Sequence, residues 1–217
     1  MHRVGIVSYS FEYSLGIFGY QDRPGDRFDV LTLLDKIREA GGDTAQLPDF
    51  MFRSLSDEEL KDVQRRAADL DVALELLGGV AWNQGIEAAM HRARAIGSSV
   101  VGCTFGILTR PNTISTLSDW DDYLARCRAR YAELLETAAA LDLKLGIENH
   151  LDFTVEELRD IVRDADSPHA GILFDIGNTL GTLDCPTEAA DLLGVPSSTP
   201  PGESQVGVSA FTVMGYV

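Results

Sequence analysis

Two kinds of hydrophobic pattern alternate along the first 194 residues of the chain. Short runs of β-branched and aliphatic residues, such as Ser99–Phe105, predict buried strands. Longer segments with apolar residues three and four positions apart, such as Asp29–Ala40, predict amphipathic helices. The six predicted strands are Val4–Phe11, Thr44–Leu47, Val72–Leu77, Ser99–Phe105, Lys144–Ile147 and Gly171–Ile176. The predicted helices are Asp29–Ala40, Ser56–Leu70, Ile86–Ile96, Asp119–Leu141, a helix that begins at Thr154, and Thr187–Leu193.

The strict alternation of strands with helices predicts a parallel sheet with right-handed crossovers. Two architectures have this order of elements: an open doubly wound sheet and a (β/α)8 TIM barrel. A doubly wound sheet is expected to carry a glycine-rich phosphate-binding turn after its first strand. Here the corresponding segment is Ser8–Tyr13, which contains no glycine. The sequence therefore favours an α/β fold of the (β/α)8 TIM-barrel type.

The length and the distribution of charge point to an incomplete barrel. A full barrel takes about 250 residues, whereas six units fill the first 194 residues here, so we expect about six of the eight βα units. Of the 52 charged residues, 51 precede position 195, and the last 23 residues contain only Glu203. We therefore expect an incomplete barrel over residues 1–194 and an irregular Pro/Ser/Gly-containing tail over 195–217, the product of truncation or of a shifted reading frame.

Composition narrows the partners and the compartment. Thirty-four acidic and 18 basic residues leave a net charge of −16, which argues against binding to nucleic acid or to anionic lipid. No apolar run approaches the roughly 18–20 residues of a membrane span. The three cysteines, Cys103, Cys127 and Cys185, lack the spacing of metal ligands and predict a reduced chain without disulfides. We expect a cytoplasmic protein.

Two carboxylates follow neighbouring predicted strands. Glu148 ends the fifth strand and Asp175 lies at the end of the sixth, 27 residues later, which is about one strand–helix unit. Because neighbouring parallel strands lie about 4.8 Å apart, both carboxylates can reach one cation. Two carboxylates with an imidazole and water suit Mn²⁺, Mg²⁺ or a similar divalent ion. The alternative is that each is a solvated strand-end residue or a helix cap.

Two segments carry a family resemblance. The sequences LGIENH (Leu145–His150) and GILFDIGNTL (Gly171–Leu180) resemble the xylose isomerase-like TIM barrels, in particular the sugar phosphate isomerases and epimerases. The resemblance implies that Glu148 and Asp175 are metal ligands. It also implies a His after strand seven and a Glu after strand eight, which have no counterpart in this sequence. Asn178 stands where many members have a substrate-contacting His, and it is expected to bind a substrate hydroxyl.

The resemblance further implies a divalent-metal-dependent isomerase or epimerase acting on a small sugar or sugar phosphate. The metal, of the Mn²⁺, Mg²⁺ or Co²⁺ type, polarises the substrate oxygens. Glu148 serves as a catalytic base that moves a proton α to a carbonyl, through an enediolate held by the metal. With two of the four ligands missing, we expect the metal to be weakly held and the chemistry to be impaired. Whether this chain is itself an active enzyme stays open.

Three further residues are candidates for substrate contact. Glu75 is a charge within the third strand, and it either faces the barrel mouth or is solvated at the strand end. Gln46 ends the second strand, where relatives often have a Glu. His150 lies two residues after Glu148 and should point to the same side, as a polar contact or as a solvent-facing loop residue.

Two other functions stay as alternatives. The related apurinic-site endonucleases need several histidines at the strand ends, whereas this chain has four in all, of which only His150 is well placed. The other alternative is a non-catalytic barrel fragment. Six parallel strands without closure leave strands one and six as open edges. A second copy of the chain that covers these edges would make a homo-oligomer.

Overall fold

The computed structural model describes residues 5–17, 19–22, 24–106 and 114–193. In this part of the chain six strands form one sheet in sequence order, and each neighbouring pair is parallel. The strands are β1 (Gly5–Val7), β2 (Thr44–Pro48), β3 (Ala73–Val80), β4 (Val100–Thr104), β5 (Lys144–Glu148) and β6 (Ala170–Leu173). An open sheet of six parallel strands with intervening helices is a partial TIM barrel, which confirms the predicted fold class.

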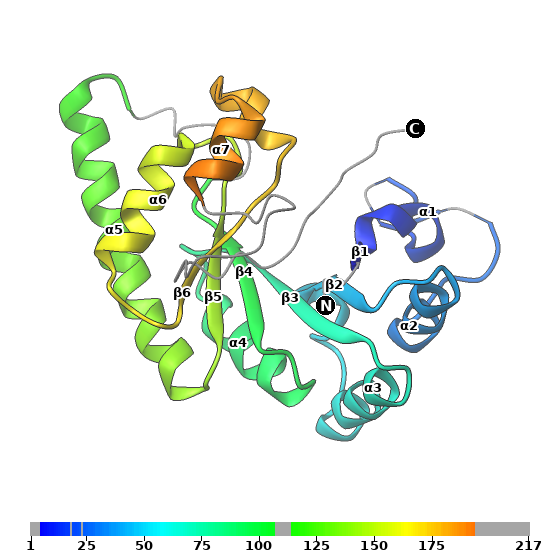
Figure 1. The fold of residues 1–217 in the computed structure, drawn as a ribbon. Coiled ribbons are helices and arrows are strands. Elements are labelled where there is room, and N and C mark those ends of the chain that lie inside the picture. The colour runs from blue at the N-terminus through cyan, green and yellow to red at the C-terminus, as the bar shows by residue number, and fades with distance from the viewer. Residues whose placement is uncertain (1–4, 18, 23, 107–113, 194–217) are drawn as a thin grey trace.

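Helices follow the curve of the sheet (Figure 1). The α-helices are α1 (Glu12–Leu15), α2 (Val30–Glu39), α3 (Asp57–Asp69), α4 (Ile86–Ala95), α5 (Leu117–Ala140), α6 (Val155–Asp164) and α7 (Pro186–Leu192). Three 3₁₀ turns are η1 (Ser8–Phe11), η2 (Asp49–Met51) and η3 (Asn178–Thr182). Helices α2 and α3 lie beside β2 and β3, and α5 and α6 lie beside β5 and β6. None of the helices in the described ranges is long and apolar enough to cross a membrane.

The structure corrects three strand boundaries. β1 ends at Val7, because Ser8–Phe11 forms η1 and not the second half of a strand. β3 continues to Val80 through a bulge between Leu77 and Gly79, where the sequence predicted a stop. β6 ends at Leu173, so Asp175 lies in the segment that follows the strand. The expected boundary at residue 194 and the tail 195–217 lie outside the described residues.

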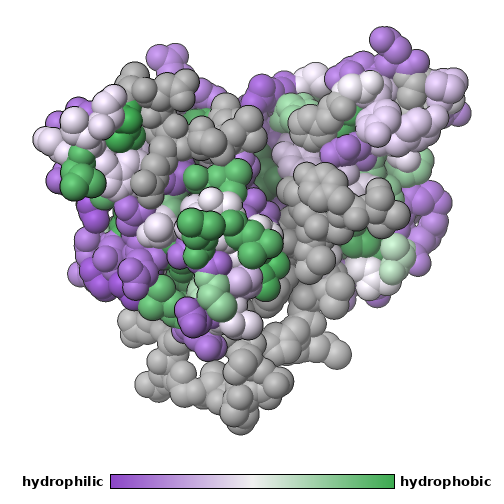
Figure 2. All heavy atoms as spheres, turned by 90° about the horizontal axis from the view of Figure 1, so that it is seen from above, coloured by the Kyte–Doolittle hydropathy of each residue, from purple (hydrophilic) through white to green (hydrophobic). Residues whose placement is uncertain are grey.

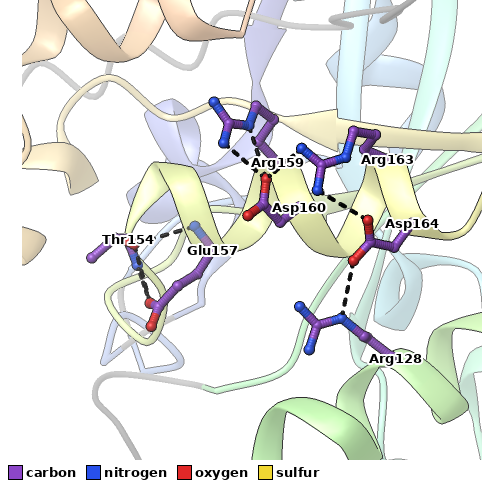
Figure 3. Close-up of polar contacts among 7 residues, drawn as sticks. All are labelled: Arg128, Thr154, Glu157, Arg159, Asp160, Arg163 and Asp164. Carbon is purple, nitrogen blue, oxygen red and sulfur yellow. Dashed lines mark hydrogen bonds and ion pairs between the residues drawn. The ribbon is translucent and has the colours of Figure 1, made fainter. Parts of the chain in front are cut away.

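Helix α6 is fixed at its start and along its length (Figure 3). Thr154 and Glu157 form the capping box that the sequence predicts, each side chain bonding the other residue's backbone N–H. Asp160 and Asp164 pair with Arg159 and Arg163, and Arg128 Nε of α5 lies 3.5 Å from Asp164 Oδ2. The contact between Arg128 and Asp164 ties α6 to α5. Exposed pairs of this kind contribute little stability each, so the cap and the apolar face hold α6 on the sheet.

A buried tyrosine joins β5 to β6 at their amino ends. The Tyr131 hydroxyl of α5 donates to the carbonyl of Leu145 at 2.7 Å and accepts from the amide of Gly171 at 3.0 Å. Tyr131 is fully buried, so both bonds lie away from water.

The three cysteines, Cys103, Cys127 and Cys185, are free, as predicted.

Two glycines allow close packing on the two faces of the sheet. A Cβ at Gly102 in β4 would lie 2.8 Å from Leu173 and 3.2 Å from Leu77, so these two leucines meet over β4 on the inner face. A Cβ at Gly78 in the β3 bulge would lie 2.5 Å from Ile86 Cδ1 and 3.1 Å from Val101 Cγ1. Neither position has room for a side chain unless its neighbours move.

Much of the described surface is polar, but several large apolar side chains are also exposed. Figure 2 shows hydrophilic residues, in purple, over the outer parts of the molecule and hydrophobic residues, in green, near the middle of that view. Several large exposed apolar side chains belong to the connection from β6 to α7, among them Ile176, Leu180 and Leu183.

We predict that Gly78→Ala lowers the free energy of unfolding by about 1–3 kcal/mol, because the added methyl group overpacks the fully buried Ile86 and Val101. Urea unfolding followed by circular dichroism measures this change. The matched control is Gly85→Ala, since Gly85 has φ −83° and open space at its Cβ position; it should change stability by less than about 0.5 kcal/mol. Equal effects of the two substitutions would contradict the packing argument.

Candidate functional site

A pocket lies on the inner face of the sheet, toward the carboxyl ends of the strands. We call it the strand-end pocket. It is lined by Val7, Tyr9, Gln46, Leu77, Glu148, Leu173 and Asp175. These residues come from five of the six strands or from the residues that directly follow them. The pocket thus brings together three of the six site residues predicted from sequence, namely Gln46, Glu148 and Asp175.

The two carboxylates of the strand-end pocket affect each other electrostatically. Burial raises the pKa of Glu148 to about 7, and the negative charges of Asp175 and Asp152 add to this rise. Asp175 is itself buried. Two like charges at one buried site repel each other unless a proton, a hydrogen-bond donor or a cation compensates them.

Hydrogen-bond donors fix both carboxylates. The amide N–H of Gly177 donates to Asp175 Oδ1 at 2.8 Å. Asn178 Nδ2 donates to Glu148 Oε1 at 3.3 Å, which opposes the rise in the pKa of Glu148. Asn178, expected to contact a substrate hydroxyl, therefore also orients Glu148.

Gln46 and Glu75 form a pair on β2 and β3. These residues are directly opposite each other in the strand register, and Gln46 Nε2 donates to Glu75 Oε2 at 3.2 Å. Burial raises the pKa of Glu75, and the bond from Gln46 opposes this rise. Glu75 does not line the strand-end pocket but holds the amide of Gln46, which does.

His150 lies close to the site but does not line the pocket. It is half-buried, and burial lowers its pKa while the negative charge of Asp175 opposes this effect. Its Nδ1 atom is buried and has no hydrogen-bond partner among the described residues. The expectation that His150 points to the same side as Glu148 stays a prediction.

Two polar residues of the site, Tyr9 and Asn149, were not predicted from sequence. Tyr9 lines the pocket, and burial followed by the charges of Glu148 and Glu12 raises its pKa. Asn149 lies between Glu148 and His150 and bonds the backbone of Asp175. Tyr9 could have been found, because it follows β1 as Glu148 and Asp175 follow or end their strands. No comparable sequence signal pointed to Asn149, because its hydrogen-bond partners are backbone atoms of Asp175.

The donors present fit a divalent cation only in part. No group of three or more His, Cys, Asp or Glu side chains within the described ranges is close enough to hold a metal ion. Glu148 and Asp175 nevertheless carry hard oxygen donors in one pocket, and a cation would relieve their repulsion. These two side chains alone would leave most coordination positions of a cation open.

A sequence model described as xylose isomerase-like TIM barrel matches residues 34–197 of this chain, about three quarters of its length. The chain belongs to the xylose isomerase-like TIM barrel family. The matched range includes both predicted metal ligands, Glu148 and Asp175, and both signature segments on which the resemblance rests.

The chain is also similar to individual proteins of known sequence or structure. The chain is 26% identical over 191 residues to the 3-oxo-isoapionate decarboxylase of Pectobacterium atrosepticum, which covers 87% of this chain and 64% of that protein. Among solved structures, a D-psicose 3-epimerase crystallised with D-fructose has a TM-score of 0.67 at 16% identity, covering 88% of this chain and 69% of that one. A D-tagatose 3-epimerase-like protein has a TM-score of 0.64 at 21% identity, covering 89% and 72%. At these identities the two structures show a shared fold.

We predict that Glu75→Gln stabilises the protein at pH 7. Because burial raises the pKa of Glu75 above its ordinary value of 4.5, the folded protein binds this proton more tightly than the unfolded chain. The ionised carboxylate therefore costs stability at pH 7, and the cost disappears as the pH falls to about 4. The glutamine side chain of the variant can still accept the bond from Gln46.

Thermal melting of the variant and the wild type between pH 4 and pH 8 measures the difference. The midpoint of the variant should exceed that of the wild type at pH 7, and the two should converge toward pH 4. Glu136→Gln, on the exposed side of α5, controls for the loss of one negative charge from a strongly acidic chain. A pH-independent difference, or the same change in both variants, would show that burial of Glu75 is not the cause.

Proposed function

We propose that this chain acts on a small sugar or sugar phosphate and moves a proton on the carbon next to a carbonyl group, as an isomerase or epimerase. The observation that carries the proposal is the pair Glu148 and Asp175, which share one buried pocket at the ends of neighbouring strands in a xylose isomerase-like chain. The fold shared with D-psicose 3-epimerase supports the choice of reaction class.

Glu148 is the proposed base. It removes the proton from the carbon, and the pair of electrons left behind moves toward the carbonyl oxygen. Return of the proton to the former carbonyl carbon, with transfer of the hydroxyl proton to the former carbonyl oxygen, gives an isomer, and return to the same carbon from the opposite face gives an epimer. Epimerisation also needs a proton donor on the opposite face of the substrate. The proposal therefore includes both reactions.

A divalent cation of the Mn²⁺, Mg²⁺ or Co²⁺ type, when bound by Glu148 and Asp175, would supply polarisation of the substrate oxygens. The residues around the pair have separate tasks. Asn178 orients Glu148 through its 3.3 Å bond. Gln46, held by Glu75, presents an amide to the pocket for a sugar hydroxyl. His150 and Asn178 are the further proposed contacts to the substrate.

The proposal places this chemistry in the cytoplasm, without a nucleic acid or membrane partner, as the net charge of −16 suggests. In the part of the chain that the structure describes, β1 and β6 are the edges of the sheet. The proposal includes a homo-oligomer in which a second copy of the chain covers these edges. A chain with no activity in the test below would instead be the non-catalytic fragment.

Decarboxylation of a sugar-derived 3-oxo acid is a second candidate. It is favoured by the 26% identity to 3-oxo-isoapionate decarboxylase over most of this chain. The electronic demand is the same, because loss of CO₂ also leaves an electron pair next to a carbonyl. The two reactions differ in how they use the carboxyl group. In decarboxylation, the protonated form of a carboxyl such as Glu148 would donate its proton to carbon.

We predict that the protein with MnCl₂ in D₂O incorporates deuterium next to the carbonyl of at least one substrate from a panel of ketoses and ketose phosphates. Proton NMR detects this exchange whichever product forms. Glu148→Gln should lower the rate of exchange about 100-fold or more, because general-base catalysis contributes at least this factor. Glu136→Gln should leave the rate unchanged.

The same reactions, supplied with 3-oxo sugar acids and followed by CO₂ release, separate the two candidates. Exchange into ketoses without CO₂ release supports the isomerase or epimerase. Release of CO₂ that Glu148→Gln abolishes, with no exchange into ketoses, supports the decarboxylase. Exchange that survives Glu148→Gln overturns the proposed role of Glu148.

A further inference from the structure

The main-chain pairing of β5 with β6 reaches Glu148 but ends before Asp175. The last paired residues are Glu148 and Leu173. Asp175 lies two residues beyond this pair and outside β6. Main-chain pairing alone therefore does not set the position of Asp175 relative to Glu148.

The side chain of Asn149 takes over where the pairing ends. Its Nδ2 donates to the carbonyl oxygen of Asp175 at 2.8 Å, and its Oδ1 accepts from the amide N–H of Asp175 at 2.6 Å. One side-chain amide thus satisfies both backbone groups of one residue. An amide can do this because it carries a donor and an acceptor side by side.

The two bonds are shielded from water. Asn149 and Asp175 are both buried, with 3% and 4% of their surface exposed. Buried hydrogen bonds are strong, and loss of one partner leaves the other unsatisfied. A residue without a polar end at position 149 would leave the backbone of Asp175 free to move within the segment that follows β6.

Neighbouring contacts hold the same segment in place. The Gly177 amide fixes the Asp175 carboxylate, and Val155 at the start of α6 donates its N–H to Asp184 beyond η3 at 3.1 Å. Leu151, with φ +126°, packs against Gly181 of η3 so closely that a Cβ there would collide with it. The loops after β5 and β6 are therefore docked on each other, and Asn149 is the residue of the β5 loop that bonds the backbone of Asp175.

We infer that Asn149 is a positioning residue that sets the distance and orientation of Asp175 relative to Glu148 for the cation held between them. The inference rests on the proposed function for the cation, but the contact of Asn149 with Asp175 is independent of it. In metal sites, substitution of residues that hold a ligand typically weakens metal affinity about 10–100-fold.

The test compares Asn149→Leu with Tyr131→Phe. Leucine has nearly the shape of asparagine but lacks both polar atoms. Tyr131→Phe also removes two buried hydrogen bonds between β5 and β6, but at the other end of these strands. Mn²⁺ affinity is measured by titration calorimetry, thermal stability without metal by circular dichroism, and protection of the Asp175 amide by hydrogen exchange and NMR.

We expect Asn149→Leu to weaken Mn²⁺ binding about tenfold or more and to speed exchange at the Asp175 amide, whereas Tyr131→Phe lowers the melting temperature but leaves Mn²⁺ affinity within about twofold. The inference is overturned if both variants lose stability alike and both keep wild-type Mn²⁺ affinity. A wild-type protein that does not bind Mn²⁺ overturns the proposed metal site; the exchange measurement then decides the positioning role alone. If Asn149→Leu does not fold, an unprotected Asp175 amide in the wild type overturns the inference, and a protected one supports it.

Discussion

Four residue pairs join β5 to β6, from Leu145 opposite Ala170 to Glu148 opposite Leu173, and the candidate site depends on this register. In parallel strands the side chains alternate between the two faces, so a shift by one residue would turn Glu148 toward the helices. The register is supported at both ends by side chains that bond main-chain groups, Tyr131 at the start and Asn149 beyond the end. The sheet thus fixes Glu148 directly, whereas Asp175, which lies beyond β6, is held by the side chain of Asn149.

Placing two carboxylates in one pocket has an electrostatic cost, and the polar groups around them reduce it. Asn178 donates to Glu148, and the Gly177 amide donates to Asp175. These donors do not remove the repulsion, since the pKa of Glu148 remains near 7. A ligand that supplies positive charge or a proton would relieve this repulsion. Such relief is common to metal-assisted proton transfer and to protonation after decarboxylation.

Sequence periodicity predicted the six strands, the parallel order and the placement of Glu148 with Asp175, because each follows from the alternation of hydrophobic residues along one unit. It failed where the backbone leaves regular structure. The apolar run from Val4 to Phe11 does not show that Ser8–Phe11 forms a 3₁₀ turn, so Tyr9 was missed. The run from Gly171 to Ile176 likewise hides the end of β6 at Leu173, and with it the need for Asn149 to hold Asp175. The hydrogen bond between Gln46 and Glu75 depends on how β2 and β3 are aligned, and this alignment cannot be read from the hydrophobic pattern of either strand.

The carboxylate pair depends on two neighbouring units of the sheet and on no others. Glu148 and Asp175 belong to consecutive units, so their geometry needs only one strand pair, one crossover helix and the docked loops. Closure of a barrel is not required for any of these contacts. The geometry of the carboxylate pair is therefore local. It depends on the register of β5 with β6 and on the contact of Asn149 with Asp175, and on no strand outside this pair.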